Sequence, residues 1–214
     1  MKIATIIVTR GHACHVKTLH TILRFNIACI QNGMVQNEVT FVNDDPFEKS
    51  ETIHRFMKTH DRIFFIDFGI QVDDESMQIV ISKNDGYGVV VFPGVKEGIN
   101  WETFKKKVNE DYQEPVEQMG LEFDTDVIAK ITGDIYSVKQ TEAKAWVLMT
   151  KPVLKSIRDK RTGVYKIHPK LSTMFSKFKE HGVKIVAFTA ARLTHTYSHE
   201  CIGNIINSSG VKAT

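Results

Sequence analysis

Four short runs of apolar residues, separated by segments with helical character, occupy the first 94 residues and restrict the fold more than any other feature. The runs are KIATIIVT (2–9), NEVTFVNDD (37–45), RIFFIDFGIQV (62–72) and YGVVVFPG (87–94). Their apolar residues are continuous rather than alternating, which is typical of strands covered on both faces. The pattern therefore predicts an α/β fold with a mostly parallel central sheet flanked by helices.

The segments between these runs carry helix signals. After the first run, apolar residues recur at spacings of three and four, and a glycine stands where the helix would end. These residues are Val16, Leu19, Leu23, Ile27, Ile30 and Gly33. Asp45, Pro46 and Glu48 supply an N-cap, a first-turn proline and a capping-box acid for a second helix. The segment DDESMQIVISKNDG (73–86) predicts a short helix that ends in a turn.

The second half of the chain is less regular. Its elements are expected at NWETFKKKV (100–108, helix), VIAKITGDIYSV (127–138) with AKAWVLMTKPVL (143–154, a strand pair or a strand and a helix), HPKLSTMFSKFKEHG (168–182, helix) and VKIVAFTA (183–190, strand). The acidic segment 110–126 is interpreted as a surface excursion. Because there is no internal repeat, low-complexity segment or linker, we expect one domain over residues 1–214.

Charge and cysteine content exclude several classes. The net charge is +3, with basic residues interleaved with acids, so we expect no nucleic-acid partner. Cys14, Cys29 and Cys201 are too few and too scattered for a disulfide framework, which fits a reducing compartment. No apolar run approaches the roughly 18 residues of a membrane span. We expect a soluble cytoplasmic protein, with room for a longer natural polypeptide.

Polar residues stand at the ends of the first three predicted strands, where ligands gather in doubly wound sheets. They are Thr9 and Arg10, then Asn43, Asp44 and Asp45, then Asp67. For Asp45 the alternative is a helix cap alone, and the same alternative holds for Asp73 and Asp74.

Asp67 is the hardest of these to explain by structure alone. It directly follows Phe64, Phe65 and Ile66, so its carboxylate would lose water at a cost of several kcal/mol unless a cation compensates it. Gly69 lacks a side chain and would let a ligand approach the backbone. A divalent ion held by one or two carboxylates and a substrate diphosphate fits this arrangement, which indicates nucleotide chemistry.

Motif absences narrow that chemistry. No G-x-G-x-x-G follows the first strand and no P-loop motif occurs, so dinucleotide and P-loop binding lack support. The sequence DFG (67–69) stands without the other kinase motifs and is accidental.

Together, the polar end of the first strand, the VNDD end of the second, and RIFFIDFGIQVDDESMQIVISKNDGYGVVVFPG resemble the nucleotide-sugar half of GT-A glycosyltransferases. In that family an apolar strand ends in an Asp-x-Asp motif. The match covers about the first hundred residues, and it departs at Gly69, which stands where the second acid would be. The whole chain also resembles the N-terminal glycosyltransferase domain of the capsid-glycosylation proteins of chloroviruses, the large algal DNA viruses.

The resemblance implies a single GT-A domain, with a nucleotide-binding half (1–100) and a sugar and acceptor half (101–214). It further implies transfer from a UDP-sugar donor to a glycan or glycoprotein acceptor, with Mn²⁺ or Mg²⁺ as cofactor. By position, Thr9 and Arg10 would face uracil, Asp44 or Asp45 the base or ribose, and Asp67 the metal. His195 and His199 are candidates for a further metal ligand.

Other residues enter as candidates for single roles. Arg10, Arg192 and Lys184 are possible cations for the leaving diphosphate, and Asp134 or Glu142 is the candidate base for an inverting reaction. Trp101 and Trp146 stack on sugar or belong to the core. His12, Cys14 and His15 lack a second ligand pair for zinc and are interpreted as a loop and helix start.

Three alternatives stay open. A nucleotidyltransferase would need a Gly-rich loop after the first strand, where TRGHACH has one glycine. A non-catalytic nucleotide-sugar-binding domain would explain the loss of the second acid at Gly69. A methyltransferase lacks its glycine-rich cofactor loop.

Overall fold

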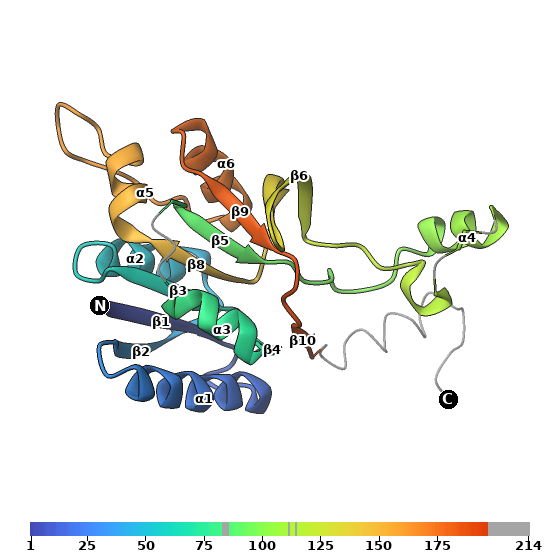
Figure 1. Cartoon of the computed structure of the whole chain (residues 1–214), viewed down its shortest axis with the longest axis horizontal. Helices are drawn as coiled ribbons and strands as arrows, with labels where there is room; N and C mark the ends of the chain where they lie inside the picture. The colour runs from blue at the N-terminus through green and yellow to red at the C-terminus, as the bar shows by residue number, and fades with distance from the viewer. Residues whose placement is uncertain (83–85, 111, 114, 197–214) are drawn as a thin grey trace.

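The structure is a computed structural model that describes residues 1–82, 86–110, 112–113 and 115–196 (Figure 1). The strands are β1 (Lys2–Thr9), β2 (Gln36–Asn43), β3 (Arg62–Ile66), β4 (Ile70–Gln71), β5 (Val89–Phe92), β6 (Thr125–Thr132), β7 (Ile135–Thr141), β8 (Ala145–Met149), β9 (Ile185–Phe188) and β10 (Thr194–His195). The helices are α1 (Val16–Asn32), α2 (Pro46–Phe56), α3 (Asp74–Ile81), α4 (Trp101–Asn109), α5 (Thr150–Ile157) and α6 (Leu171–Glu180), with a 3₁₀ turn at Val116–Gln118. The predicted alternation of strands and helices up to Gly94 is confirmed. The predicted strand 62–72 is corrected, because β3 ends at Ile66 and β4 belongs to a separate two-stranded sheet with β10.

The central sheet is mixed, which corrects the expectation of a mostly parallel sheet. Its eight strands lie in the order β2-β1-β3-β8-β5-β9-β7-β6. The pairs β1–β2, β1–β3 and β5–β9 are parallel, whereas β3–β8, β5–β8, β7–β9 and β6–β7 are antiparallel. All five residues of β8 are buried, because helices cover both faces of this strand. Its continuous apolar sequence therefore does not indicate whether β8 runs parallel or antiparallel to its neighbours.

Helices cover both faces of the sheet (Figure 1). On one face, α2, α5 and α6 pack on alternate residues of β1, β3 and β5 around the fully buried Trp146. On the other face, α1 and α3 pack on the intervening residues of the same strands. By contrast, α4 has no buried residue, and Figure 1 shows it projecting away from the sheet.

The most regular apolar stripe of helix α1 does not face the core. The buried apolar residues of α1 are Ile22, Phe25 and Cys29. The stripe that predicts the helix in the sequence lies on the outer side, with Val16 76%, Leu19 43%, Leu23 55%, Ile27 55% and Ile30 77% exposed. The helix prediction is confirmed, including the left-handed cap at Gly33.

Several start signals are borne out. Asp45 N-caps α2 by accepting hydrogen bonds from Phe47 N and Glu48 N, and Asp73 N-caps α3 through Ser76 N. His15 caps α1 by accepting from Lys17 N. Among the described helices, none has the length and hydrophobicity needed to cross a membrane.

Candidate functional site

Five parallel strands, β1, β2, β3, β5 and β9, end at the same edge of the sheet, and most of the candidate site residues gather there (Figure 1). The antiparallel strand β8 begins at this edge, since Ala145 pairs with Ile66 of β3 and with Phe92 of β5. Lys144 therefore lies between the ends of β3 and β5, and its carbonyl accepts a hydrogen bond from Asp67 N at 2.8 Å.

Arg10, Asp44 and Lys49 form an ion-pair network where β1 and β2 end. Arg10 Nε donates to Asp44 Oδ2 at 2.9 Å, and Lys49 Nζ donates to Asp44 Oδ1 at 2.7 Å. Burial pushes the pKa of Asp44 upward, but the hydrogen bonds and charges of Lys49 and Arg10 outweigh it, so the pKa lies below its ordinary value. The Arg10 guanidinium also lies 5.1 Å from the centre of the Phe68 ring, which links this network to the β3 end.

A hollow of about 440 Å³ opens beside this network. It is lined by Thr9, His12, Cys14, Phe41, Asn43 and Glu48. Gly11 and His12, both at positive φ, make a tight turn that is closed by hydrogen bonds between Arg10 and Ala13. The Thr9 hydroxyl donates to Val42 O at 3.0 Å, which joins β1 to β2. The hollow has the size of small-ligand sites, which begin at about 300 Å³.

Asp67 lies directly after β3 and is half-buried. Its Oδ1 accepts a hydrogen bond from Phe68 N at 2.8 Å, and no salt bridge within the described residues involves its carboxylate. Burial raises the pKa of Asp67, and the Phe68 hydrogen bond and the charge of Lys49 act against this rise. The strand end thus holds a carboxylate that its protein surroundings do not fully stabilise in the charged form.

Gly69 has a structural reason to differ from the second acid of Asp-x-Asp. Its φ is +75°, and a Cβ built on it would lie 2.9 Å from Thr196 O. Thr196 N donates to Gly69 O at 3.0 Å, just past β10, which pairs antiparallel with β4. The absence of a side chain at Gly69 therefore lets the backbone of Thr196 pack closely against it. A direct contact between Gly69 and a ligand stays a prediction.

His195 reaches the same crevice from β10. Its Nδ1 lies 3.3 Å from Val95 O. Burial and the charge of Lys144 lower the pKa of His195, while the Val95 carbonyl and the charges of Glu97 and Asp67 oppose this. Asp67 is thus close enough to act on the imidazole electrostatically.

A cavity of about 160 Å³ adjoins His195 and contains a carboxylate that the sequence interpretation missed. Its lining residues are Ile70, Gly94, Val95, Asp124, Lys144, Leu193 and His195. Asp124 is 6% exposed, and its Oδ1 accepts from Gly94 N at 3.1 Å and from Thr125 Oγ1 at 2.8 Å. Burial raises the pKa of Asp124, although these hydrogen bonds and the charge of Lys144 act in the opposite direction. Asp124 is one of many acids in segment 110–126, and no local spacing singles it out.

The other proposed residues divide by position. Glu142 is exposed, and its backbone N donates to Asp124 O at 2.8 Å, beside the cavity. Asp134 lies in the β6–β7 turn next to Thr189, at the same edge, but three strands (β8, β5 and β9) separate β7 from β3. Arg192 is exposed between β9 and β10, with its backbone N on Asp73 Oδ1. His199 lies outside the described residues.

One candidate is corrected, and for a second the core alternative is confirmed. Lys184 precedes β9 and so lies at the opposite edge of the sheet from the other site residues. Trp146 is fully buried and stacks on Phe65 with ring centres 4.8 Å apart, so it belongs to the core. Trp101 is 54% exposed on α4.

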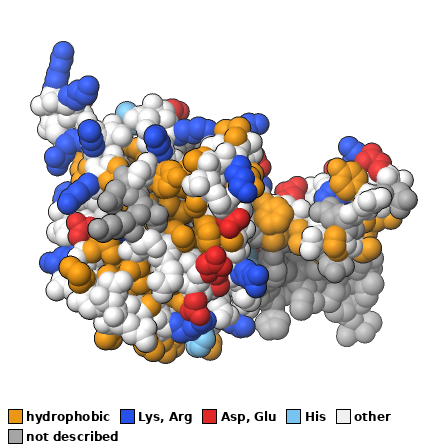
Figure 2. Space-filling view, in the orientation of Figure 1, with side chains coloured by type: hydrophobic (Ala, Val, Ile, Leu, Met, Phe, Trp, Pro, Cys, Tyr) orange, Lys and Arg blue, Asp and Glu red, His pale blue; other side chains and the backbone are white. Residues whose placement is uncertain are grey.

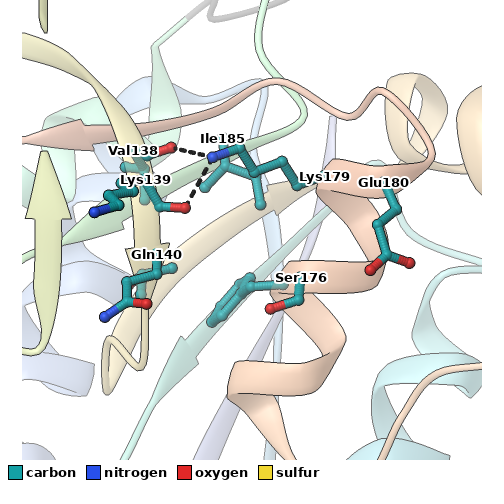
Figure 3. Close-up of a pocket in the computed structure, with 9 residues that line it drawn as sticks. Val138, Lys139, Gln140, Ser176, Lys179, Glu180 and Ile185 are labelled. Carbon is teal, nitrogen blue, oxygen red and sulfur yellow. Dashed lines mark hydrogen bonds between the residues drawn. The ribbon is translucent and has the colours of Figure 1, made fainter. Parts of the chain in front are cut away.

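A separate groove of about 320 Å³ lies between β7 and α6 (Figure 3). Lys179 Nζ donates to the carbonyls of Val138 and Lys139 at 3.0 and 2.8 Å, where β7 has diverged from β9. The Lys179 ammonium thus supplies hydrogen bonds to β7 carbonyls that have no partner on β9. None of the candidate residues at the ends of β1, β2 and β3 lines this groove.

The described residues contain no group of three or more His, Cys, Asp and Glu side chains that could hold a metal ion. Asp67 and His195, the two described candidates for metal ligands, both lie at this edge of the sheet, and the charge of Asp67 acts on the His195 imidazole. Asp67 Oδ2 has no hydrogen-bond donor among the described residues, which leaves it available for such an ion.

Comparison with solved structures supports the overall fold. The crystal structure of A197 from STIV matches with a TM-score of 0.57 and 12% identity, over 92% of this chain and 87% of that chain. An inositol-1-phosphate CTP transferase from T. maritima (TM-score 0.44, 10% identity, 98% of each chain) also matches. GalNAc-T7 with UDP, GalNAc and Mn²⁺ matches as well (TM-score 0.47, 11% identity, 94% of this chain and 44% of that chain). These two scores are too low to support an argument. No family model and no curated protein sequence matches the chain.

Proposed function

We propose that this protein is a metal-dependent glycosyltransferase that moves a sugar from a UDP-sugar to a glycan acceptor. The observation that carries the proposal is Asp67, a half-buried carboxylate with a raised pKa at the end of β3. A buried carboxylate without a paired cation is costly to maintain for stability alone. A divalent ion that arrives with a diphosphate would supply the missing charge.

The nucleoside is assigned to the hollow beside the ends of β1 and β2. Phe41 is 51% exposed at its wall and offers a ring face to a base, and Asn43 and Glu48 offer polar groups for its edge or for the ribose. Thr9 shapes the floor through its bond to Val42 O, and Asp44 holds Arg10 in place. Asp45 contributes by beginning α2, since both of its cap bonds go to the backbone.

The diphosphate is assigned to the space between Arg10 and Asp67. Arg10 lies over Phe68, the residue next to Asp67, so its guanidinium is near the proposed phosphate position. Asp67, with His195 as second ligand, would hold Mn²⁺ or Mg²⁺, which stabilises the negative charge that develops on the leaving diphosphate. Arg192 and His199 stay candidates for further contacts to the donor or the ion.

The sugar and the acceptor hydroxyl are assigned to the cavity at the end of β5. Asp124 and Lys144 offer a carboxylate and an ammonium that can bind sugar hydroxyls, and Asp124 has the raised pKa expected of a proton acceptor. Glu142, whose backbone N donates a hydrogen bond to Asp124 O, is the second candidate base. Asp134, which lies farther from the cavity, is the third. By the resemblance to the chlorovirus proteins, the acceptor would be a glycan of a capsid glycoprotein.

The test is calorimetric titration of UDP into the protein with Mn²⁺ and with EDTA. Asp67→Asn is expected to abolish the Mn²⁺-dependent part of UDP binding. Its thermal stability is expected to stay equal or rise, because the substitution removes a poorly compensated buried charge. Asp126→Asn is the matched control, because Asp126 is an exposed carboxylate on β6. This variant is expected to bind UDP with the same Mn²⁺ dependence as the parent.

Equal UDP binding in EDTA and Mn²⁺ would refute the metal-dependent proposal. Release of pyrophosphate from a nucleoside triphosphate and a sugar phosphate would instead select a nucleotidyltransferase. UDP-sugar binding without hydrolysis or transfer would select the non-catalytic nucleotide-sugar-binding domain.

A further inference from the structure

The outer side of α1 carries an apolar stripe that the fold leaves uncovered. Its members are Val16, Leu19, Leu23, Ile27 and Ile30, each between 43% and 77% exposed. Figure 1 places α1 along the lower edge of the molecule, and Figure 2 shows hydrophobic side chains at that edge. Single exposed apolar residues need no explanation, but a continuous stripe along four turns of a helix indicates an interaction surface.

The spacing of the stripe is symmetric about Leu23. Val16 and Ile30 lie seven residues before and after it, and Leu19 and Ile27 lie four residues before and after it. When two identical helices pack antiparallel about a two-fold axis, residues equally distant from the axis on either side face each other. Val16 would then meet Ile30 of the second copy, Leu19 would meet Ile27, and Leu23 would meet Leu23. Every apolar position of the stripe finds an apolar partner.

The charges around the stripe also fit this arrangement. Helix α1 has no acidic residue in its first turn and no basic residue in its last turn. The antiparallel pair would bring Lys17 of one copy close to the C-terminal end of the other α1, where the helix dipole favours a cation. Arg24, the charged residue next to the axis, is already paired with Asp74 of its own chain.

The rim of the stripe has the polar character of an interface edge. Arg24 forms an ion pair with Asp74, at the start of α3. A shallow hollow of about 260 Å³ between α1 and α3 takes in Ile27 and is bordered by Arg24, Gln31 and Asp74. An apolar centre with a polar rim is typical of protein–protein contacts. The charge of Asp74 is compensated by Arg24. The neighbouring exposed acid Glu75 would be repelled by an anionic membrane surface.

We propose that α1 is the interface of an antiparallel homodimer of this chain, with a two-fold axis through Leu23. The first experiment measures mass by light scattering across a wide range of concentrations. The parent chain is expected at twice 24.3 kDa, and Leu23→Glu and Ile30→Glu are expected at 24.3 kDa. Val164→Glu, at a 57% exposed valine in the loop between α5 and α6, is the matched control and is expected to remain dimeric.

Cross-linking with a short bismaleimide tests the two-fold axis. Leu23→Cys is expected to link to itself, whereas Val16→Cys links only when mixed with Ile30→Cys, and the parent chain with its three cysteines sets the baseline. A parent that is monomeric at all concentrations, or Val16→Cys chains that link to each other as in a parallel pair, would overturn the proposal. Vesicle binding by a monomeric parent that Leu23→Glu abolishes would also overturn it and assign the stripe to a membrane.

Discussion

Replacing Gly69 tests whether this chain can accommodate the second acid of an Asp-x-Asp motif. An alanine there would adopt a φ of +75° and place its Cβ 2.9 Å from Thr196 O. Positive φ alone costs a non-glycine residue roughly 1–2 kcal/mol. The contact with a backbone oxygen must be relieved by moving Thr196, which donates a hydrogen bond to Gly69 O. Together these effects are expected to cost about 2–3 kcal/mol of the free energy of unfolding.

Gly182→Ala provides the matched control for the backbone effect. Gly182 has a φ of +77°, and a Cβ there would meet no atom within 4 Å. For a chain of this size, 1 kcal/mol shifts the melting temperature by roughly 2–4 °C. By the same relation, Gly69→Ala is expected to lower it by about 4–12 °C and Gly182→Ala by about half of that. Circular dichroism melting curves in EDTA measure both variants without any contribution from bound metal.

Gly69→Asp extends the test to function. It restores the letters of the motif, but the new side chain points at Thr196, so Mn²⁺-dependent UDP binding is expected to stay equal or weaken. Equal melting temperatures for Gly69→Ala and Gly182→Ala, or tighter Mn²⁺ binding by Gly69→Asp, would refute the argument that packing of the β10 segment excludes the second acid.

Two further predictions concern the carboxylates on either side of Asp67. Asp44→Asn is expected to lower stability at neutral pH by about 1 kcal/mol, because it removes the partner of the mostly buried Lys49. Since the pKa of Asp44 is lowered on folding, this stability is present above the ordinary carboxyl pKa and is lost as pH falls through the folded value; a gap between parent and variant that widens on acidification in urea titrations would contradict it. Asp124→Asn is expected to keep UDP binding and lose most sugar transfer. Asp134→Asn, the control, is expected to keep both activities. Normal sugar transfer by Asp124→Asn would show that Asp124 has a purely structural role.

Local signals in the sequence predict the fold well where the cause is local. The caps at Asp45 and Asp73, the proline at the start of α2, and the buried strands β3 and β5 depend on neighbours within a few residues. The direction of β8 could not be predicted, because a strand covered on both faces has the same composition in either direction.

Helix α1 illustrates a second limit. Two apolar stripes run along it, one with Ile22, Phe25 and Cys29 and the other centred on Leu23. Hydrophobic periodicity identifies the helix from either stripe but does not say which one faces the sheet. The most regular stripe proved to be the exposed one, and its regularity is better explained by a partner helix than by the uneven surface of a sheet.

The candidate site shows why strand ends alone predict only half of an active site. Thr9, Arg10, Asp44 and Asp67 follow parallel strands, so the rule that ligands gather at these ends brings them together. Three further residues reach the same edge in other ways. Lys144 directly precedes the antiparallel strand β8, and Asp124 is held by a backbone hydrogen bond to Gly94. His195 lies on β10, the two-residue strand that pairs with β4. These routes are long-range contacts that leave no periodic trace in the sequence. Because Asp67 and His195 come from segments about 130 residues apart, any ion held by both would require β10 to be docked on β4, and Gly69 is the residue whose backbone permits that docking.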